Sequence, residues 1–218
     1  MNGLLLGLSP AERRFVRRTF DRCPSVELPA STTLTALEPT DSKLLVVDEG
    51  VVLLVAEGGP PRPTVLALAC PGDVLAPPAR EEHVRALTAA RLVAVPQREY
   101  ELLLGLPGIA RALLESLLDA VDKRQQSLAS LRGTHAERLQ ETLHRLALDH
   151  GKVCSEGVEI DLPLTHELLA QMVGSARETV TSTLGRFQRE GRLVRTGRTY
   201  RLTVSPDLLE ARAERAVV

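Results

Sequence analysis

Aromatic residues and cysteines are both scarce in this chain. Tryptophan is absent from the 218 residues, and aromatic side chains make up 2% of them. A core must therefore be built from Leu, Val and Ala, which the 44% hydrophobic content can supply. The three cysteines, Cys23, Cys70 and Cys154, lie far apart and form no CxxC pair, so they lack the ligand spacings typical of zinc and iron–sulfur sites. We interpret them as buried or incidental free thiols.

Long apolar runs are also missing. No stretch approaches the roughly 18 apolar residues of a membrane helix, and the apolar segment Met1–Leu8 is too short for a signal sequence. The sequence holds no Ser/His/Asp arrangement, Gly-rich phosphate loop or metalloprotease pattern. It therefore predicts a cytoplasmic protein that has no membrane contact and is not an enzyme.

The segment 164–204 predicts two helices followed by a hairpin. Thr165 is a candidate N-cap, and Gly174 is placed to end the first helix because glycine tolerates a positive φ. The second helix is predicted to begin near Ala176 and to end at Gly191. One of its faces is apolar, with Val180, Leu184 and Phe187 at helical spacing.

The opposite face of the second predicted helix is polar near its start. It carries Arg177, Glu178, Thr181 and Ser182, which can hydrogen-bond base edges or phosphates. Short strands at 193–194 and 200–204, around a turn at 196–198, then form a predicted wing. Two helices joined by a short glycine-containing turn, the second with a polar start, make the geometry that enters a DNA major groove.

Basic charge is concentrated in the same segment. From Thr165 to Val204 there are seven arginines and three glutamates, a local net charge of +4, whereas the whole chain carries −1. Five of these arginines lie from the end of the second helix through the wing: Arg189, Arg192, Arg195, Arg198 and Arg201. A small helical subdomain closed by a hairpin is the simpler alternative, but a basic patch in a near-neutral protein favours a polyanionic partner, and we predict double-stranded DNA.

The run LT-x-x-x-LA-x-x-VG-x-x-RETV-x-x-x-L, from Leu164 to Leu184, resembles the DNA-binding domain of the cyclic-AMP receptor protein and fumarate-nitrate regulator (CRP/FNR) superfamily of bacterial transcription factors. The resemblance implies that Arg177 and Glu178 read bases, since arginine suits guanine and glutamate suits the cytosine amino group. Thr181 and Ser182 are further candidates for base reading. Ser182 replaces the family's usual second arginine, so the family's half-site sequence is not expected to carry over.

The same resemblance implies a set of phosphate contacts. Thr165, His166, Ser175 and Thr179 fall where the family contacts phosphates, and Arg195 and Arg198 in the wing are further candidates. RNA polymerase is a second partner that the resemblance implies.

Short β-rich runs, broken by glycine and proline, fill the chain from Val26 to Pro96. A helix is expected before them, from the Ser9-Pro10 cap to about Arg22. The predicted strands are 44–47, 51–56, 64–69, 84–88 and 92–95, with turns at Gly58-Gly59-Pro60-Pro61 and at Pro71-Gly72-Asp73. Alone, this pattern indicates a small antiparallel sandwich or roll. Beside the C-terminal resemblance, Leu44-x-x-Val47-x-x-Gly50-x-Val52 and the 71–73 turn resemble the double-stranded β-helix of cyclic-nucleotide-binding domains.

This second resemblance fails where such a domain binds its nucleotide. The family follows the Gly-Asp turn with a Gly-Glu pair, a short helix and an Arg-Ser/Thr pair, which hold the ribose and the cyclic phosphate. Here Ala76-Pro77 replaces the Gly-Glu pair, the loop is shortened, and Glu81-Glu82 lie beside Arg80, the one candidate arginine. Proline removes an amide donor and the glutamates repel a phosphate. We therefore predict that the protein has no cofactor and does not depend on a cyclic nucleotide.

Other effectors remain open at this point. His83 is the only histidine of the predicted sensory domain, and it could ligate heme as in gas-sensing relatives. We favour a solvated loop histidine beside two glutamates instead. The N-terminal cysteine cluster of the fumarate-nitrate sensors is absent, because only Cys23 lies near the N-terminus.

A long helix is predicted from about Pro107 to Leu131, with two apolar stripes. One stripe is predicted to form a dimer interface and consists of Ile109, Leu113, Leu117, Val121 and Leu128, with polar Arg124 interrupting it. Leu114 and Leu118 form the other stripe, which is predicted to cover the β domain. Members of the family dimerise through this helix, whereas a helix packed wholly within one domain is the alternative. Gly133-Thr134 then ends the helix.

Together these features predict an α+β chain in three parts. Residues 1–106 form a β-roll sensory domain of the double-stranded β-helix type, residues 107–132 a dimerisation helix and hinge, and residues 133–218 a winged helix-turn-helix domain. The predicted function is that of a homodimeric, sequence-specific transcription regulator that binds a two-fold related DNA site. A regulator responding to a heme-bound gas or a metabolite, and a degenerate member acting as a protein-interaction module, are the alternatives.

Overall fold

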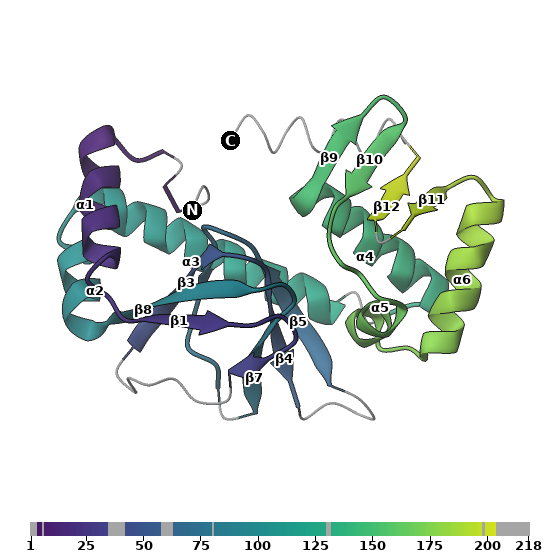
Figure 1. The fold of residues 1–218 in the computed structure, drawn as a ribbon, viewed down its shortest axis with the longest axis horizontal. Helices are drawn as coiled ribbons and strands as arrows, with labels where there is room; N and C mark the ends of the chain where they lie inside the picture. Colours follow the sequence, from purple (N-terminus) through teal and green to yellow (C-terminus); the bar gives the residue numbers. More distant parts are fainter. Residues whose placement is uncertain are drawn as a thin grey trace. The chain divides into compact units, whose positions relative to one another are not determined.

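The computed structural model describes residues 4–5, 7–34, 42–57, 63–79, 81–129, 132–197 and 199–203. The chain divides into two compact units, Met1–Leu128 and Ala129–Val218. Figure 1 shows a β-rich first unit with a long helix, and a second unit of three helices and a small sheet. Both units agree with the predicted α+β fold.

Two four-stranded antiparallel sheets form the first unit. One has the strand order β1-β8-β3-β6 and the other β2-β7-β4-β5. The strands of the first sheet are Ser25–Leu28, Ala90–Pro96, Ser42–Glu49 and Val74–Leu75, and those of the second are Thr33–Leu34, Glu82–Ala86, Val52–Ala56 and Thr64–Ala69. The five predicted strands are confirmed as β3, β4, β5, β7 and β8, whereas β1, β2 and β6 were not predicted.

The apolar sequence of β3 explains how this unit is layered. Leu45 and Val47 face a core between the two sheets, whereas Leu44 and Val46 face the opposite way. There they meet α1 (Pro10–Phe20), α2 (Gln97–Leu104) and α3 (Pro107–Ala129), which supply side chains such as Phe20, Leu103 and Ile109. Because successive residues of a strand point to opposite faces, one continuous apolar run serves both cores.

Turns and caps follow the local sequence. Ser9 and Glu12 form the predicted capping box of α1, which ends at Phe20, two residues before the predicted end. The 71–73 turn is confirmed, with Gly72 at a φ of 99° and the Cys70 amide donating to the Asp73 carboxylate at 2.8 Å. Gly50 adopts a φ of 78° between β3 and β4, where a Cβ atom would come within 2.1 Å of the Ala89 carbonyl oxygen, so only glycine fits. The predicted 58–61 turn lies outside the described residues.

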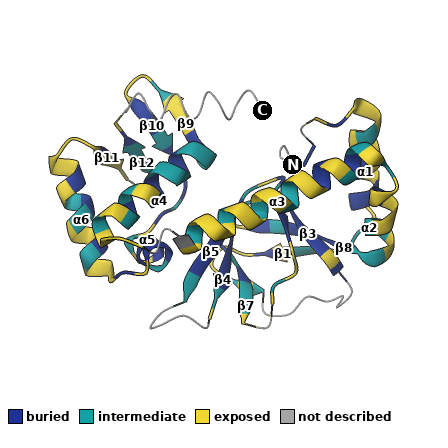
Figure 2. Cartoon of the chain, turned by 180° about the vertical axis from the view of Figure 1, so that it is seen from behind, coloured by how far each residue is buried: buried dark blue, intermediate teal, exposed yellow. Residues whose placement is uncertain are grey.

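The two apolar stripes of α3 differ from the predicted ones in the first half of the helix. Ile109 and Leu113, predicted to face a partner, are buried in the core of their own unit, and Leu117 packs partly against that core. Leu114 and Leu118, predicted to cover the β domain, are 57% and 56% exposed. Val121 and Leu128 are exposed, as the prediction requires. Figure 2 shows the exposed positions running along α3. The prediction failed because helical spacing identifies two stripes but does not say which one meets the sheet.

The second unit packs three helices against one antiparallel sheet. Its helices are α4 (His135–His150), α5 (His166–Val173) and α6 (Arg177–Arg189). The sheet has the order β11-β12-β10-β9, with strands Leu193–Thr196, Thr199–Leu202, Gly157–Ile160 and Gly151–Cys154. The β11–β12 hairpin is the predicted wing, whereas the β9–β10 hairpin was not predicted. None of the helices in the described part of the chain is both long and apolar enough to span a membrane.

Candidate DNA-binding interface

The first helix of the helix-turn-helix is fixed at both ends as its sequence predicts. The Thr165 hydroxyl accepts a hydrogen bond from the Leu168 amide at 3.1 Å, which makes Thr165 the N-cap of α5. Gly174 ends the helix in the left-handed conformation, with φ and ψ of 56° and 49°. Between these ends, Leu168, Leu169, Met172 and Val173 are buried. The burial and the two caps hold the turn that leads into α6.

The next helix, α6, has one buried and one exposed face. Val180, Leu184 and Phe187 are buried in the unit's core, as predicted. The four predicted base-reading residues, Arg177, Glu178, Thr181 and Ser182, are all exposed on the first two turns. Their spacing of one, three and one residues places them on a common face. This face can therefore be offered to a ligand without disturbing the core.

The start of α6 lacks a side-chain cap. Its N-cap is Ala176, which makes no side-chain hydrogen bond to the first turn. The first amides of a helix have no partner within the helix, and they carry the positive end of its dipole. Such a terminus favours an anion. The sequence itself carries this signal, because alanine stands where a capping residue is usual.

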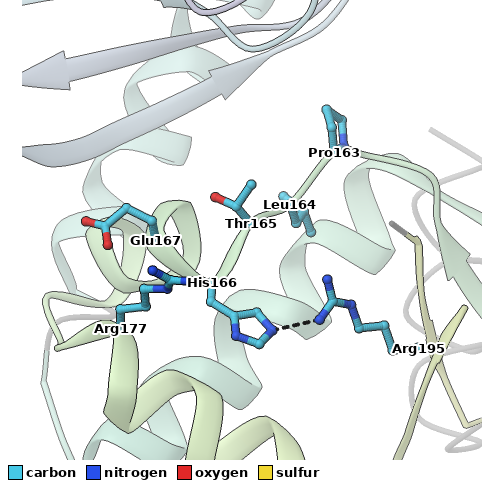
Figure 3. A pocket seen from close by; sticks show the side chains of 7 residues that line it. All are labelled: Pro163, Leu164, Thr165, His166, Glu167, Arg177 and Arg195. Atoms are coloured by element: carbon cyan, nitrogen blue, oxygen red, sulfur yellow. Dashed lines mark hydrogen bonds between the residues drawn. The ribbon is translucent and has the colours of Figure 1, made fainter. Parts of the chain in front are cut away.

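A pocket opens between the start of α5, the start of α6 and the wing. Pro163, Leu164, Thr165, His166, Glu167, Arg177 and Arg195 line it. Figure 3 shows the His166 ring pointing towards the Arg195 guanidinium. His166 Nε2 lies 3.0 Å from Arg195 Nη1, and His166 Nδ1 lies 2.7 Å from Thr181 Oγ1. Residues from three separate elements thus meet at one imidazole.

The environment of His166 disfavours its charged form. Partial burial lowers its pKa below the ordinary value of 6.5, and the positive charges of Arg195 and Arg177 lower it further. The free protein therefore holds this imidazole neutral at pH 7. The nearby Tyr200 hydroxyl is buried, which raises the pKa of Tyr200, and its ring lies 5.5 Å from the Arg195 guanidinium carbon.

The predicted phosphate-contacting residues fall into three groups. Thr165 and Arg195 are exposed, while His166 and Thr179 are partly exposed. Ser175 is buried, and its hydroxyl has no hydrogen-bond partner. The Ser175 side chain thus turns into the core directly after the left-handed Gly174, and a phosphate contact at Ser175 stays a prediction. Arg198 lies outside the described residues.

Several arginines of the basic segment are engaged within the protein. Arg192 pairs with Glu190 at 3.1 Å and lies over the Phe187 ring at 4.3 Å, and Arg201 pairs with Glu156. The local positive charge is thus partly neutralised by neighbouring glutamates. Arg195 differs, because the partners recorded for its guanidinium are uncharged: the Gly197 carbonyl at 3.2 Å and the His166 ring.

Comparisons with known proteins agree with this geometry. Residues 137–212 match the Crp-like helix-turn-helix domain. The chain is 32% identical over 107 residues to the Global nitrogen regulator of Nostoc sp., a match that covers 47% of each chain. It is 34% identical over 143 residues to Regulatory protein CysR of Synechococcus elongatus, covering 61% of this chain and 63% of that protein. The second unit therefore contains a Crp-like helix-turn-helix domain.

The fold is shared along most of the chain. A structure of a CooA mutant from Carboxydothermus hydrogenoformans superposes with a TM-score of 0.74 at 21% identity, covering 88% of this chain and 89% of that one. The matched segments span about half the length of the nitrogen regulators. The chain therefore shares the fold of the CooA structure along most of its length.

The loop of the first unit where a CRP/FNR protein would hold a cyclic nucleotide has its own internal contacts. Glu82 accepts a hydrogen bond from the Ala79 amide at 3.2 Å and pairs with Arg124 of α3. Asp73 lies 3.4 Å from Lys123, also on α3. Both carboxylates are therefore paired with α3. Arg80, the one candidate for a phosphate-binding arginine, lies outside the described residues.

His83 and the cysteines do not form a shared site in the described part of the chain. His83 lies on β7 with its side chain 12% exposed, and it pairs with Glu57 at 3.1 Å. The prediction of a solvated loop histidine is therefore wrong. Cys23 donates to the Thr19 carbonyl at 3.3 Å, and burial raises its pKa to about 11, which makes it a poor nucleophile at neutral pH. Among the described residues, no group of three or more His, Cys, Asp or Glu side chains could hold a metal ion.

Proposed function

We propose that this chain is a sequence-specific DNA-binding transcription regulator. The observation that carries the proposal is the exposed polar face of α6, where Arg177, Glu178, Thr181 and Ser182 surround a helix start without a side-chain cap. A helix of this kind places its N-terminal side chains against base edges in the major groove. The match to the Crp-like helix-turn-helix domain and the named relatives, which are regulators, support the same function.

Selection of bound duplexes from a random DNA library tests this proposal. The full-length chain should enrich one sequence motif with two-fold symmetry. A variant with both Arg177→Ala and Glu178→Ala should retain salt-sensitive DNA binding without enriching the motif. If the unaltered chain enriches no motif, the function proposed here is wrong, and a protein-interaction module becomes the better reading of the domain.

The proposed active form is a homodimer held together by α3. Its exposed apolar residues are Leu114, Leu118, Val121 and Leu128, and Gln125 occupies the same stripe. Their spacing alternates between four and three residues, which is the pattern of a two-stranded coiled coil with one polar position. A two-fold dimer would present two α6 helices to half-sites about one helical turn apart. This arrangement accounts for a two-fold related DNA site.

We also propose that DNA binding does not depend on a cyclic nucleotide. The amide of Ala79 is already bonded to the Glu82 carboxylate, and Pro77 and Pro78 supply no amide donor. The carboxylates of Asp73 and Glu82 would oppose a phosphate at this loop. Their pairing with α3 gives the helix a fixed contact with the sheet that needs no ligand.

A further inference from the structure

The hydrogen bonds around His166 run in one direction. An arginine guanidinium can only donate, so Nε2 of His166 accepts from Arg195 Nη1 at 3.0 Å. The imidazole proton must then lie on Nδ1, which donates to Thr181 Oγ1 at 2.7 Å. The Thr181 hydroxyl in turn donates to the Arg177 carbonyl at 2.9 Å. The chain therefore joins Arg195 of the wing to two base-reading positions of α6.

This direction limits what the neutral His166 ring can do. Its single N–H is already used by Thr181, and its other nitrogen accepts from Arg195. The neutral ring has no N–H left for a phosphate. A protonated ring has a second N–H on Nε2, but this group points at the Arg195 donor. Protonation would therefore separate Arg195 from the ring and leave both groups with free donors.

The charges around the pocket decide when protonation is favourable. Arg195 comes from β11 and Arg177 from α6, and both repel a charged imidazole in the free protein. Glu167, from the helix of His166 itself, is the one acidic residue of the lining, and Figure 3 shows its carboxylate turned away from the ring. An anionic phosphate in the pocket would compensate both arginines. It would also accept from the new N–H group.

We infer that His166 is a positioning residue that couples DNA binding to the uptake of a proton. The protonated His166 ring releases the Arg195 guanidinium, and the ring and the guanidinium then each donate a hydrogen bond to a phosphate. This inference rests on the proposed function, since it concerns the same DNA interface. In the free protein, the neutral ring fixes Arg195 and Thr181 in place. In the complex, the charged ring and the released guanidinium contact the backbone.

The sign of the pH dependence follows from linkage. The pKa of His166 is low in the free protein and would be raised by a bound phosphate, so affinity for DNA increases as the pH falls through the interval between these two values. Above the interval the affinity is constant. Each unit of difference between the two pKa values corresponds to about a tenfold gain in affinity.

The experiment measures DNA affinity by fluorescence anisotropy from pH 8 to pH 6 at constant salt, using the motif selected for the full-length chain. Unaltered protein should bind more tightly as the pH falls, and for a pKa rise of one unit the gain should approach tenfold once the pH lies below the pKa of the free protein. Calorimetry in buffers of different ionisation enthalpy should report uptake of a fraction of one proton. His166→Gln should remove both effects, because a glutamine amide can accept from Arg195 and donate to Thr181 but cannot titrate.

His144→Gln is the matched control. His144 lies on α4, and burial and the charge of Arg192 lower its pKa as well. The variant therefore tests whether any histidine near an arginine can cause the pH dependence of DNA binding. This control should retain the pH dependence. The inference is overturned if His166→Gln keeps the full pH dependence or if the unaltered protein shows none while still selecting its motif. If the unaltered protein binds DNA at no pH, the proposed function fails as well.

A measurement without DNA gives an independent test. Nuclear magnetic resonance of the imidazole nitrogens in the free protein at pH 8 should show the proton of His166 on Nδ1. Arg195→Ala should weaken this preference, because it removes the donor that makes Nε2 an acceptor. A proton found on Nε2 of the unaltered protein would overturn the hydrogen-bond chain on which the inference depends.

Discussion

The guanidinium of Arg124 on α3 pairs with the carboxylate of Glu82 at the start of β7. The Glu82 side chain is only 9% exposed, whereas the Arg124 side chain is 44% exposed, so the pair lies at the edge of the solvent. Lys123, the preceding residue of α3, pairs with Asp73 at 3.4 Å. The long helix is therefore fixed to both ends of the 73–82 segment. These two ion pairs need no ligand.

Cyclic nucleotides should therefore leave the protein unchanged. Titration of cyclic AMP and of cyclic GMP to millimolar concentration should give no saturable heat in calorimetry, and DNA affinity should stay constant. The physical reason is that Pro77 and Pro78 carry no amide donor, that the Ala79 amide already donates to Glu82, and that the carboxylates of Asp73 and Glu82 disfavour a phosphate. 5′-AMP serves as a control for nonspecific ionic effects. A saturable heat accompanied by tighter DNA binding would contradict the prediction.

Arg177→Ala should weaken binding at the selected motif by roughly 1–3 kcal/mol and relax the preference at one base pair of each half-site. A bidentate arginine contact with guanine is lost, while the remaining contacts persist. Quantitative competition with single-base variants of the motif measures both effects. Arg111→Ala, which removes the same charge from an exposed position of α3 in the first unit, is the control and should leave the base preference intact. Unchanged selectivity in Arg177→Ala would mean that α6 does not read the bases.

Arg195→Ala should weaken binding to all sequences about equally. It should also reduce the slope of log affinity against log salt concentration by about 0.9, as expected for one lost phosphate contact. Arg192→Ala is the control, because Arg192 already pairs with Glu190 and should alter the slope less. Arg198→Ala is predicted from the sequence alone to behave like Arg195→Ala. A loss confined to the selected motif would show instead that Arg195 reads bases.

Replacing both Leu118 and Val121 by glutamate should give monomers in sedimentation and abolish tight binding to the two-fold site. These side chains are 56% and 50% exposed, so the charges should not disturb the unit's own core. Leu102→Glu, a similar change at a 52% exposed position of α2, should remain dimeric. Leu113→Ala should behave differently again, because it opens a cavity in the core and costs about 2–5 kcal/mol of folding stability without removing the dimer. A dimeric Leu118/Val121 variant would exclude this interface.

The sequence predicted the helix-turn-helix closely because its signals are local. The Thr165 cap, the left-handed Gly174 and the buried face of α6 each follow from the spacing of a few neighbouring residues. Short elements without such signals were missed, among them α2, β6 and the β9–β10 hairpin. Their formation depends on pairing and packing with distant segments, which a single sequence does not display.

The features of the candidate sites that were not predicted have the same origin. Ser175 follows Gly174 on a turn, and only the packing of the unit decides that its side chain is buried. The contact between His166 and Arg195 joins residues 29 positions apart, so no local pattern could predict it. The stripes of α3 were found, but their assignment required knowledge of which face meets β3 and β8. Sequence periodicity shows that a helix has an apolar face, whereas the segment that packs against this face is decided by the whole fold.

The exposed apolar residues of α3 also determine how the fraction of dimer would depend on the concentration of such a regulator. A monomer leaves Leu114, Leu118, Val121 and Leu128 in contact with water, and pairing would remove that apolar surface. When most of the protein is monomeric, the amount of paired protein grows with the square of the total amount. Halving the cellular dose would then leave about a quarter of the form able to occupy a two-fold site. Occupancy of the target sites would therefore change more than proportionally with the concentration of the chain. Changes in its rate of synthesis or degradation would then regulate its target genes.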